Sequence, residues 1–140
     1  MKKKFFKVIS MLLVIACILS SASFAVTDSS EYIASTSANV TKSGNTVTVS
    51  FFVSGRDVMN VIGVSYIYLF ENSGNGWKLV KSFLSSDSAY TSDLLSYNAD
   101  FKNDSVSYVG SASNSYYAYV SFYAADNTGS DTIGRTTPTV

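Results

Sequence analysis

The sequence predicts an all-β, single-domain protein built as an antiparallel β-sandwich of about seven strands. Apolar and polar residues alternate over several short runs, which is the pattern of strands with one face in a core. Clusters of Gly, Asn, Asp and Ser separate these runs at intervals of roughly ten residues. No apolar stripe with the period of a helix occurs after residue 25. These observations together favour a sandwich over a helical or mixed fold.

Residues 1–25 have the features of an export signal. Four lysines within the first seven residues precede an apolar run at 8–19, and small residues before position 26 form a signal peptidase site. The run of about twelve residues is too short to span a bilayer, which takes roughly 20. We therefore expect cleavage after Ala25 and a secreted, extracellular chain without a membrane span. Residues 14–17 also resemble a lipobox, so a lipid anchor at Cys17 is the alternative.

Charge and cysteine content limit what the exported chain can bind and what holds it together. Six Lys and Arg residues and ten Asp and Glu residues follow the signal, so the mature chain has a net charge of −4. This mild acidity argues against nucleic acid as a partner. Cys17 is the only cysteine, and the mature domain therefore has no disulfide and depends on burial and strand pairing.

The first half of the domain is expected to contain three strands. Residues 26–34 read as a flexible leader, and the domain is expected to occupy 35–140. A weak first strand at 35–42 and a strongly alternating strand at 46–53 form a hairpin around Ser43-Gly44-Asn45. Gly55-Arg56-Asp57 interrupts the alternation, and 58–63 reads as a loop or irregular turn that closes the end of the core. A third strand is expected at 64–71. Within it, Ile67 and Leu69 are expected to face the core, while Val64, Tyr66 and Tyr68 form the outward set.

The second half continues as short strands separated by polar turns. A turn at 72–76 leads into a strand at 77–83, and 85–93 reads as a polar loop. Further elements are expected in this order: strands at 97–102 and 106–110, parted by Asn103-Asp104; a strand at 115–124; a turn at 125–131; and a closing strand at 133–140, limited by Pro138.

The strand at 115–124 carries two interleaved patterns and a family resemblance. One side has Tyr116, Ala118, Val120, Phe122 and Ala124, whose order resembles the penultimate strand of immunoglobulin-like and fibronectin type III-like domains. The resemblance implies an immunoglobulin-like sandwich in which Tyr116 forms a "tyrosine corner", with its hydroxyl group on nearby backbone. Antibody domains have Cys where this chain has Ala118, so the resemblance is to the disulfide-free domains.

The chain as a whole also resembles small secreted bacterial proteins that carry a domain of unknown function. The shared features are the N-terminal signal, a Val-x-Val-x-Phe-x-Val strand, Ile62-Gly63, Gly76-Trp77, and the aromatic strand before a Gly-Ser-Asp turn. These motifs are structural. The resemblance therefore implies a fold and an exported location, and it implies no catalytic residue.

The residue types available make catalysis and metal binding unexpected. The chain has no His, and the mature part has no Cys, which excludes Ser-His-Asp and Cys-His schemes and thiolate or imidazole zinc sites. Carboxylates at Asp87, Asp93, Asp100 and Asp104 lie in turns or on exposed faces, where solubilising or turn-forming roles are the simpler interpretation. The oxygen-rich segment 126–131 does not match a calcium loop, and the same residues suit a turn. We expect no enzyme, metal or cofactor.

An aromatic surface is the remaining candidate site. In a sandwich of this type the third and penultimate strands are neighbours, which would gather outward tyrosines on one sheet: Tyr66, Tyr68, Tyr117, Tyr119 and Tyr123, with Phe70 beside them. Such a surface can bury against a protein or stack on sugar rings. It can equally act as cross-strand pairing that stabilises a sheet without disulfides. Trp77, at a turn exit, is expected in the core or at its rim.

Three functional hypotheses follow. The first is a non-enzymatic domain that contacts an unknown protein or the cell envelope. The second is a carbohydrate-binding module that holds a cell-surface glycan on the tyrosines. The third is a secreted toxin or bacteriocin-like effector.

Overall fold

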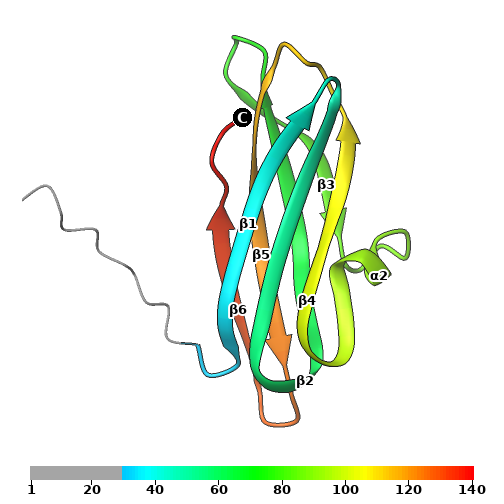
Figure 1. Ribbon diagram of the computed structural model, residues 1–140, viewed down its shortest axis with the longest axis vertical. Helices are drawn as coiled ribbons and strands as arrows, with labels where there is room; N and C mark the ends of the chain where they lie inside the picture. Colours follow the sequence, from blue (N-terminus) through cyan, green and yellow to red (C-terminus); the bar gives the residue numbers. More distant parts are fainter. Residues whose placement is uncertain (1–29) are drawn as a thin grey trace, which may run out of the picture.

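The computed structural model describes residues 30–140, and the expected signal peptide, Cys17 and residues 26–29 of the expected leader lie outside the described residues. The described chain forms one strongly curled antiparallel sheet with a single short helix (Figure 1). Its elements, in order, are β1 (Ile33–Ser43), β2 (Thr46–Asn72), β3 (Trp77–Leu84), α2 (Thr91–Leu94), β4 (Leu95–Val109), β5 (Ser115–Ala125) and β6 (Ser130–Thr136). The predicted all-β, single-domain, antiparallel class is confirmed.

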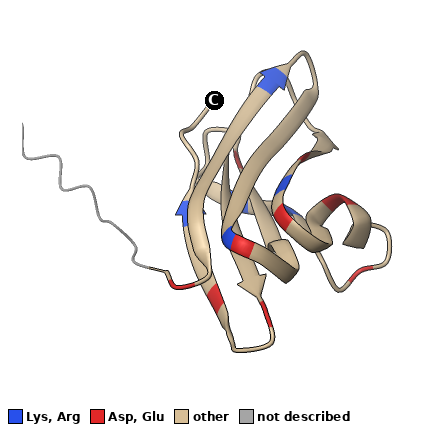
Figure 2. Cartoon of the chain, turned by 60° about the horizontal axis from the view of Figure 1, so that its bottom comes forward, with Lys and Arg blue, Asp and Glu red and all other residues tan. Residues whose placement is uncertain are grey.

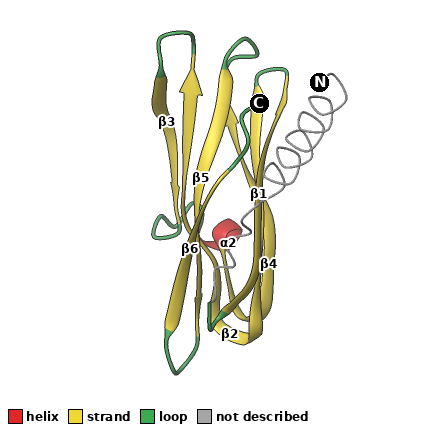
Figure 3. Ribbon diagram, turned by 90° about the vertical axis from the view of Figure 1, so that its left-hand side faces the viewer, coloured by secondary structure: helices red, strands yellow, loops and turns green. Residues whose placement is uncertain are grey.

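The long strand β2 is the centre of the sheet, because its two halves have different neighbours. Residues 46–54 lie between β1 and β4, whereas residues 66–72 lie between β3 and β5. Strand β6 extends the second half by pairing with β5. From the side, β3, β5 and β6 are seen on one side of the molecule and β1 and β4 on the other (Figure 3). The curl thus folds one half of the sheet toward the other.

The prediction of about seven strands is wrong, since residues 30–140 form six strands and two of the expected interruptions lie inside continuous strands. Gly55 and its neighbours do not form a loop; they belong to β2, and the register with β4 jumps there from Ser54 to Met59. Asn103-Asp104 likewise lies within β4, opposite the first half of β2. At the first of these sites the residues typical of turns mark an irregularity that bends a strand without ending it.

The core lies on the concave side of the curl. Its largest fully buried side chains come from β1, β2, β3, β5 and α2, and they include Tyr116, Phe83, Phe122, Ile33, Ile62, Ile67, Leu69 and Leu94. Ile67 and Leu69 face inward as predicted. Val64, predicted in the outward set, is instead fully buried, because a β-bulge between Val64 and Tyr66 resets the alternation.

Gly63 occupies the crowded point where β2 leaves β4 and continues beside β5. Its φ of +153° is one that side chains rarely adopt, and a Cβ atom there would overlap the carbonyl oxygen of Leu94. Only glycine permits this close approach of α2 and β4 to the bend of β2. Local packing therefore explains the glycine of Ile62-Gly63, one of the motifs on which the resemblance to small secreted proteins was based.

Both ends of the described chain are attached to the sheet. Ser30 is buried, and the Asp131 carboxylate accepts hydrogen bonds from its hydroxyl group and from the backbone N–H of Glu31. At the other end, β6 stops at Thr136, yet residues 137–140 remain beside β5 through backbone hydrogen bonds between Val140 and Tyr116. The expected closing strand at 133–140 is thus shorter, and the expected loop at 85–93 contains the start of α2.

Candidate binding surface

Tyr116 lies fully buried at the end of the core, and its hydroxyl group forms a compact polar cluster. The hydroxyl oxygen accepts a hydrogen bond from the backbone N–H of Ser111 at 2.7 Å, five residues upstream. The hydroxyl group donates to Glu71 Oε1 at 2.5 Å, and Glu71 is the residue opposite Tyr116 on β2. Gly110 packs so closely that a Cβ atom there would overlap the hydroxyl group. The hydroxyl group therefore ties the loop before β5 to the end of β2.

The electrostatics of this cluster favour an ionised Glu71 and a protonated Tyr116. Hydrogen bonds from Tyr116 and then Asn114 hold the pKa of the Glu71 carboxyl below its ordinary value. Burial, followed by the hydrogen bond to Glu71, raises the pKa of the Tyr116 hydroxyl. The sequence placed Tyr116 beside backbone but gave no sign of Glu71, because the contact depends on the register between β2 and β5. Both shifts fit a structural link and do not indicate a reactive group.

The predicted tyrosines lie on the convex face of the second half of the sheet. Tyr68 is directly opposite Tyr119, and Phe70 is directly opposite Tyr117, on the neighbouring strands β2 and β5. Every one of the five tyrosines is half-buried. We use the name aromatic face for the outward side chains of β3, the second half of β2, and β5: Tyr66, Tyr68, Phe70, Trp77, Leu79, Leu84, Tyr117, Tyr119 and Tyr123.

The rings of the aromatic face contact one another in two groups. Tyr66 stacks on Tyr68 with ring centroids 4.7 Å apart and lies 6.2 Å from Tyr119. Phe70 stacks on Tyr117 at 4.9 Å, and Trp77 meets Tyr117 edge-on at 4.6 Å. These distances are those of favourable aromatic pairs. The aromatic face is therefore a packed layer whose rings support one another.

Tyr119 and Tyr123 carry the face toward β6. Tyr119 lies across Gly134, where a Cβ atom would overlap the tyrosine hydroxyl group. Tyr123 pairs with Thr132 on β6 and with Gly63 on β2, and none of the aromatic contacts described above includes it. Tyr123 thus shares the face without belonging to either ring group.

Edge strand β3 contributes the most exposed apolar groups of this face. Trp77 is 42% exposed and Leu79 is 52% exposed, and Leu84 lies next to Tyr66 across the strand pair. Trp77 therefore joins the surface, where the sequence suggested the core or its rim. Sequence reasoning missed Leu79 and Leu84, since their side of the strand depends on a bulge between Leu69 and Phe70.

The convex face of this half of the sheet has no charged side chain at any position that the strand register places outward. Between the aromatic residues these positions hold only Ser, Thr, Asn and Gly: Asn72, Ser82, Ser115, Ser121, Thr132, Gly134 and Thr136. The register places the charged residues of these strands on the other side of the sheet. The remaining charged residues of the described chain lie elsewhere on the sheet or in turns (Figure 2). A broad uncharged surface with aromatic and aliphatic groups is thus available to a partner.

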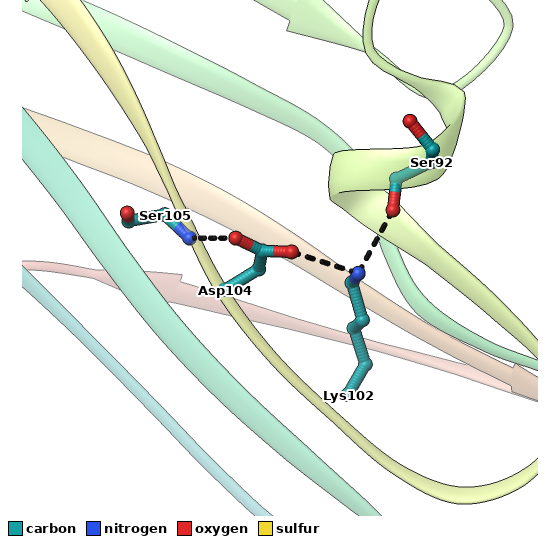
Figure 4. A network of polar contacts seen from close by, with 4 residues as sticks. All are labelled: Ser92, Lys102, Asp104 and Ser105. Atoms are coloured by element: carbon teal, nitrogen blue, oxygen red, sulfur yellow. Dashed lines mark hydrogen bonds and ion pairs between the residues drawn. The ribbon is translucent and has the colours of Figure 1, made fainter.

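Two of the carboxylates considered as catalytic candidates, Asp87 and Asp104, are engaged in local contacts. Asp104 accepts hydrogen bonds from Lys102 Nζ and from the backbone N–H of Ser105, and Lys102 also donates to the carbonyl oxygen of Ser92 (Figure 4). Partial burial opposes ionisation of Asp104, but these hydrogen bonds hold its pKa below the ordinary value. Asp87 accepts a hydrogen bond from the backbone of Ala89 in its own turn. These are structural contacts.

The oxygen-rich segment 126–131 forms a turn whose two carboxylates are occupied. Asp126 Oδ1 accepts from the hydroxyl group and backbone N–H of Thr128, which lower the pKa of its carboxyl. Asp131 accepts from Ser30, which lowers its pKa as well. Within residues 30–140 no group of three or more His, Cys, Asp or Glu side chains is placed to hold a metal ion.

The part of the chain that the structure describes contains no helix that is both long and apolar enough to cross a membrane. No protein-family model, curated protein or solved structure matches the chain.

Proposed function

We propose that the protein is a secreted, non-enzymatic, immunoglobulin-like domain that binds a protein partner through the aromatic face. The observation that carries the proposal is the uncharged convex surface of β3, β2 and β5, with Trp77 and Leu79 as its most exposed apolar groups. Aromatic side chains are enriched and charged side chains depleted at the centres of protein interfaces. The same composition is found here.

The strand neighbours support the immunoglobulin-like part of this proposal. If β2 is divided at its register break between Ser54 and Met59, the described part of the chain has seven strand segments. Segments one, two and five (β1, 46–54 and β4) then pair together, and the other four pair together. Residues 95–99 of β4 also pair with residues 59–63 of the third segment, where the two groups join. Immunoglobulin-type sandwiches likewise place strands A, B and E in one sheet and C, F and G in the other. The hydroxyl contact of Tyr116 with Ser111 agrees with a tyrosine corner.

Ring geometry favours a protein over a sugar as the partner of this face. A sugar stacks on a ring whose flat side is open to solvent. On this face, the ring centroids of Tyr66 and Tyr68 are 4.7 Å apart and those of Phe70 and Tyr117 are 4.9 Å apart, so each ring has one side in close contact with its neighbour. The most exposed groups of the face are Leu79 and Trp77. These groups suit a protein surface that fits between them.

Site-specific photocrosslinking tests the proposal. p-Benzoylphenylalanine in place of Leu79 reports on the aromatic face, and the same residue in place of Val109, which is 76% exposed on β4, serves as the matched control. In cells that produce the protein, we expect one discrete protein adduct from position 79 and none from position 109. Addition of the unlabelled wild-type domain should abolish the adduct, whereas addition of the unlabelled Trp77→Ala variant should not. Equal adducts at both positions, or no adduct at position 79, would refute it.

A further inference from the structure

The convex face of the other half of the sheet has a different and equally distinctive composition. The register aligns outward residues of β1, the first half of β2, and β4 in five rows of three. We use the name hydroxyl face for these residues: Ser43-Thr46-Val109, Thr41-Thr48-Ser107, Asn39-Ser50-Ser105, Ser37-Phe52-Asn103 and Ser35-Ser54-Phe101. All but Val109, Phe52 and Phe101 are Ser, Thr or Asn. Not one is charged.

The hydroxyl face is open to solvent and mostly free of internal hydrogen bonds. Hydroxyl groups pair in only two of the five rows, between Ser35 and Ser54 at 2.8 Å and between Thr48 and Ser107 at 3.2 Å. Five outward positions along a strand span about 27 Å, at roughly 3.4 Å per residue. The face therefore offers a long array of neutral donors and acceptors.

Two aromatic rings and a hollow lie together near one end of this array. Phe52 and Phe101 lie on neighbouring strands with centroids 6.4 Å apart and an interplanar angle of 28°, and Phe101 is 54% exposed. A shallow depression of about 160 Å³ adjoins Phe52 and is lined also by Asn39 and Asn103. Two amide groups thus line the depression together with the Phe52 ring.

We propose that the hydroxyl face binds an uncharged polysaccharide chain, with Phe52 and Phe101 under the sugar rings and Asn39 and Asn103 bonded to sugar hydroxyl groups. The rings supply apolar surface for the C–H side of a sugar. Amides and hydroxyls both donate and accept, as polyhydroxylated ligands require. A charged glycan would find no counter-charge here, because no outward position of the face is ionisable. The site is separate from the aromatic face and does not depend on its role.

Affinity electrophoresis in native gels tests this assignment. The probes are soluble uncharged polysaccharides, namely xyloglucan, galactomannan and hydroxyethylcellulose, with heparin and polygalacturonate as charged comparators. We expect at least one uncharged polysaccharide to retard the wild-type protein. Phe101→Ala and Asn103→Ala should each weaken this retardation about tenfold, as expected when one ring contact or one hydrogen-bonded group is lost. Leu79→Ser, on the aromatic face, should leave it unchanged.

Several results would overturn the inference. These are no retardation by any uncharged polysaccharide, retardation by the charged polymers alone, or equal retardation of wild type and both hydroxyl-face variants. Because Phe101 and Asn103 are exposed, their variants should fold, and a denaturation curve equal to that of wild type establishes this. A failure of photocrosslinking at position 79 would not change the polysaccharide retardation. Protein binding by the aromatic face and polysaccharide binding by the hydroxyl face can therefore be refuted independently.

Discussion

Tyr116→Phe removes one hydroxyl group from the polar cluster at the end of the core and leaves the buried ring in place. The wild-type hydroxyl accepts from Ser111 and donates to the Glu71 carboxylate. A hydrogen bond to a charged group contributes about 1.5–3 kcal/mol, and the orphaned Ser111 N–H adds to the loss if no water reaches it. We therefore expect the free energy of unfolding to fall by about 2–3 kcal/mol. At roughly 4 °C or more per kcal/mol, Tm should fall by about 8 °C or more.

The cost of Tyr116→Phe should depend on pH. The folded-state pKa of Glu71 lies below its ordinary value of 4.5, so its contribution to stability is present above that value and is lost as the pH falls through the folded pKa. The difference in unfolding free energy between wild type and variant should therefore be largest at neutral pH. In acid it should shrink toward about 1 kcal/mol, the value of a neutral hydrogen bond.

Urea denaturation at pH 7 and at acid pH measures both effects, and a double-mutant cycle with Glu71→Gln isolates the coupling. Tyr97→Phe is the matched control, since Tyr97 is 59% exposed and loss of its hydroxyl should change stability by less than about 0.5 kcal/mol. A cost for Tyr116→Phe no larger than that of the control, or a cost that grows in acid, would refute the reasoning.

Three further substitutions test the fold. Gly63→Ala should lower the free energy of unfolding by about 3 kcal/mol or prevent folding, because its Cβ would overlap the Leu94 carbonyl oxygen. Gly74→Ala is the control: its Cβ meets open space, and backbone strain alone should cost about 1 kcal/mol. Urea titration compares the two variants. By the same assay, Phe122→Ala should lower the free energy of unfolding by about 3–5 kcal/mol, because Phe122 is fully buried. Leu79→Ala should cost far less, because Leu79 is 52% exposed. Similar costs for the two variants would contradict the assignment of Phe122 to the core and Leu79 to the outer face. Asp131→Ala should speed amide hydrogen exchange at Glu31 and Tyr32, and unchanged exchange there would show that the carboxylate does not hold this segment.

Local patterns predicted the faces of the strands well. Ile67 and Leu69 were placed inward and Tyr66 and Tyr68 outward from alternation and from the ability of tyrosine to keep its hydroxyl in water, and the structure agrees. The hairpin around Gly44, with its φ of +58°, followed from turn chemistry. Both depend on residues close in sequence.

Features that depend on register could not be predicted in the same way. The residues around Gly55 read as a turn in the sequence. Whether the strand ends or bends there depends on the strand it pairs with, and that strand is β4, which lies more than forty residues further along the chain. The bulge that buries Val64 and the contact of Glu71 with Tyr116 have the same origin. The hydroxyl face was missed because each of its strands alone resembles an ordinary solvated strand.

The most direct test of the central claim is titration calorimetry with the purified partner, that is, the protein that photocrosslinking captures at position 79. The assay compares Trp77→Ala, on the aromatic face, with Phe101→Ala, on the hydroxyl face, both exposed aromatic residues of the same sheet. We predict that Trp77→Ala weakens binding about tenfold or more, as for an aromatic residue at an interface centre, and that Phe101→Ala binds as wild type does. Equal affinities for wild type and Trp77→Ala would contradict the claim that this face is the protein-binding surface.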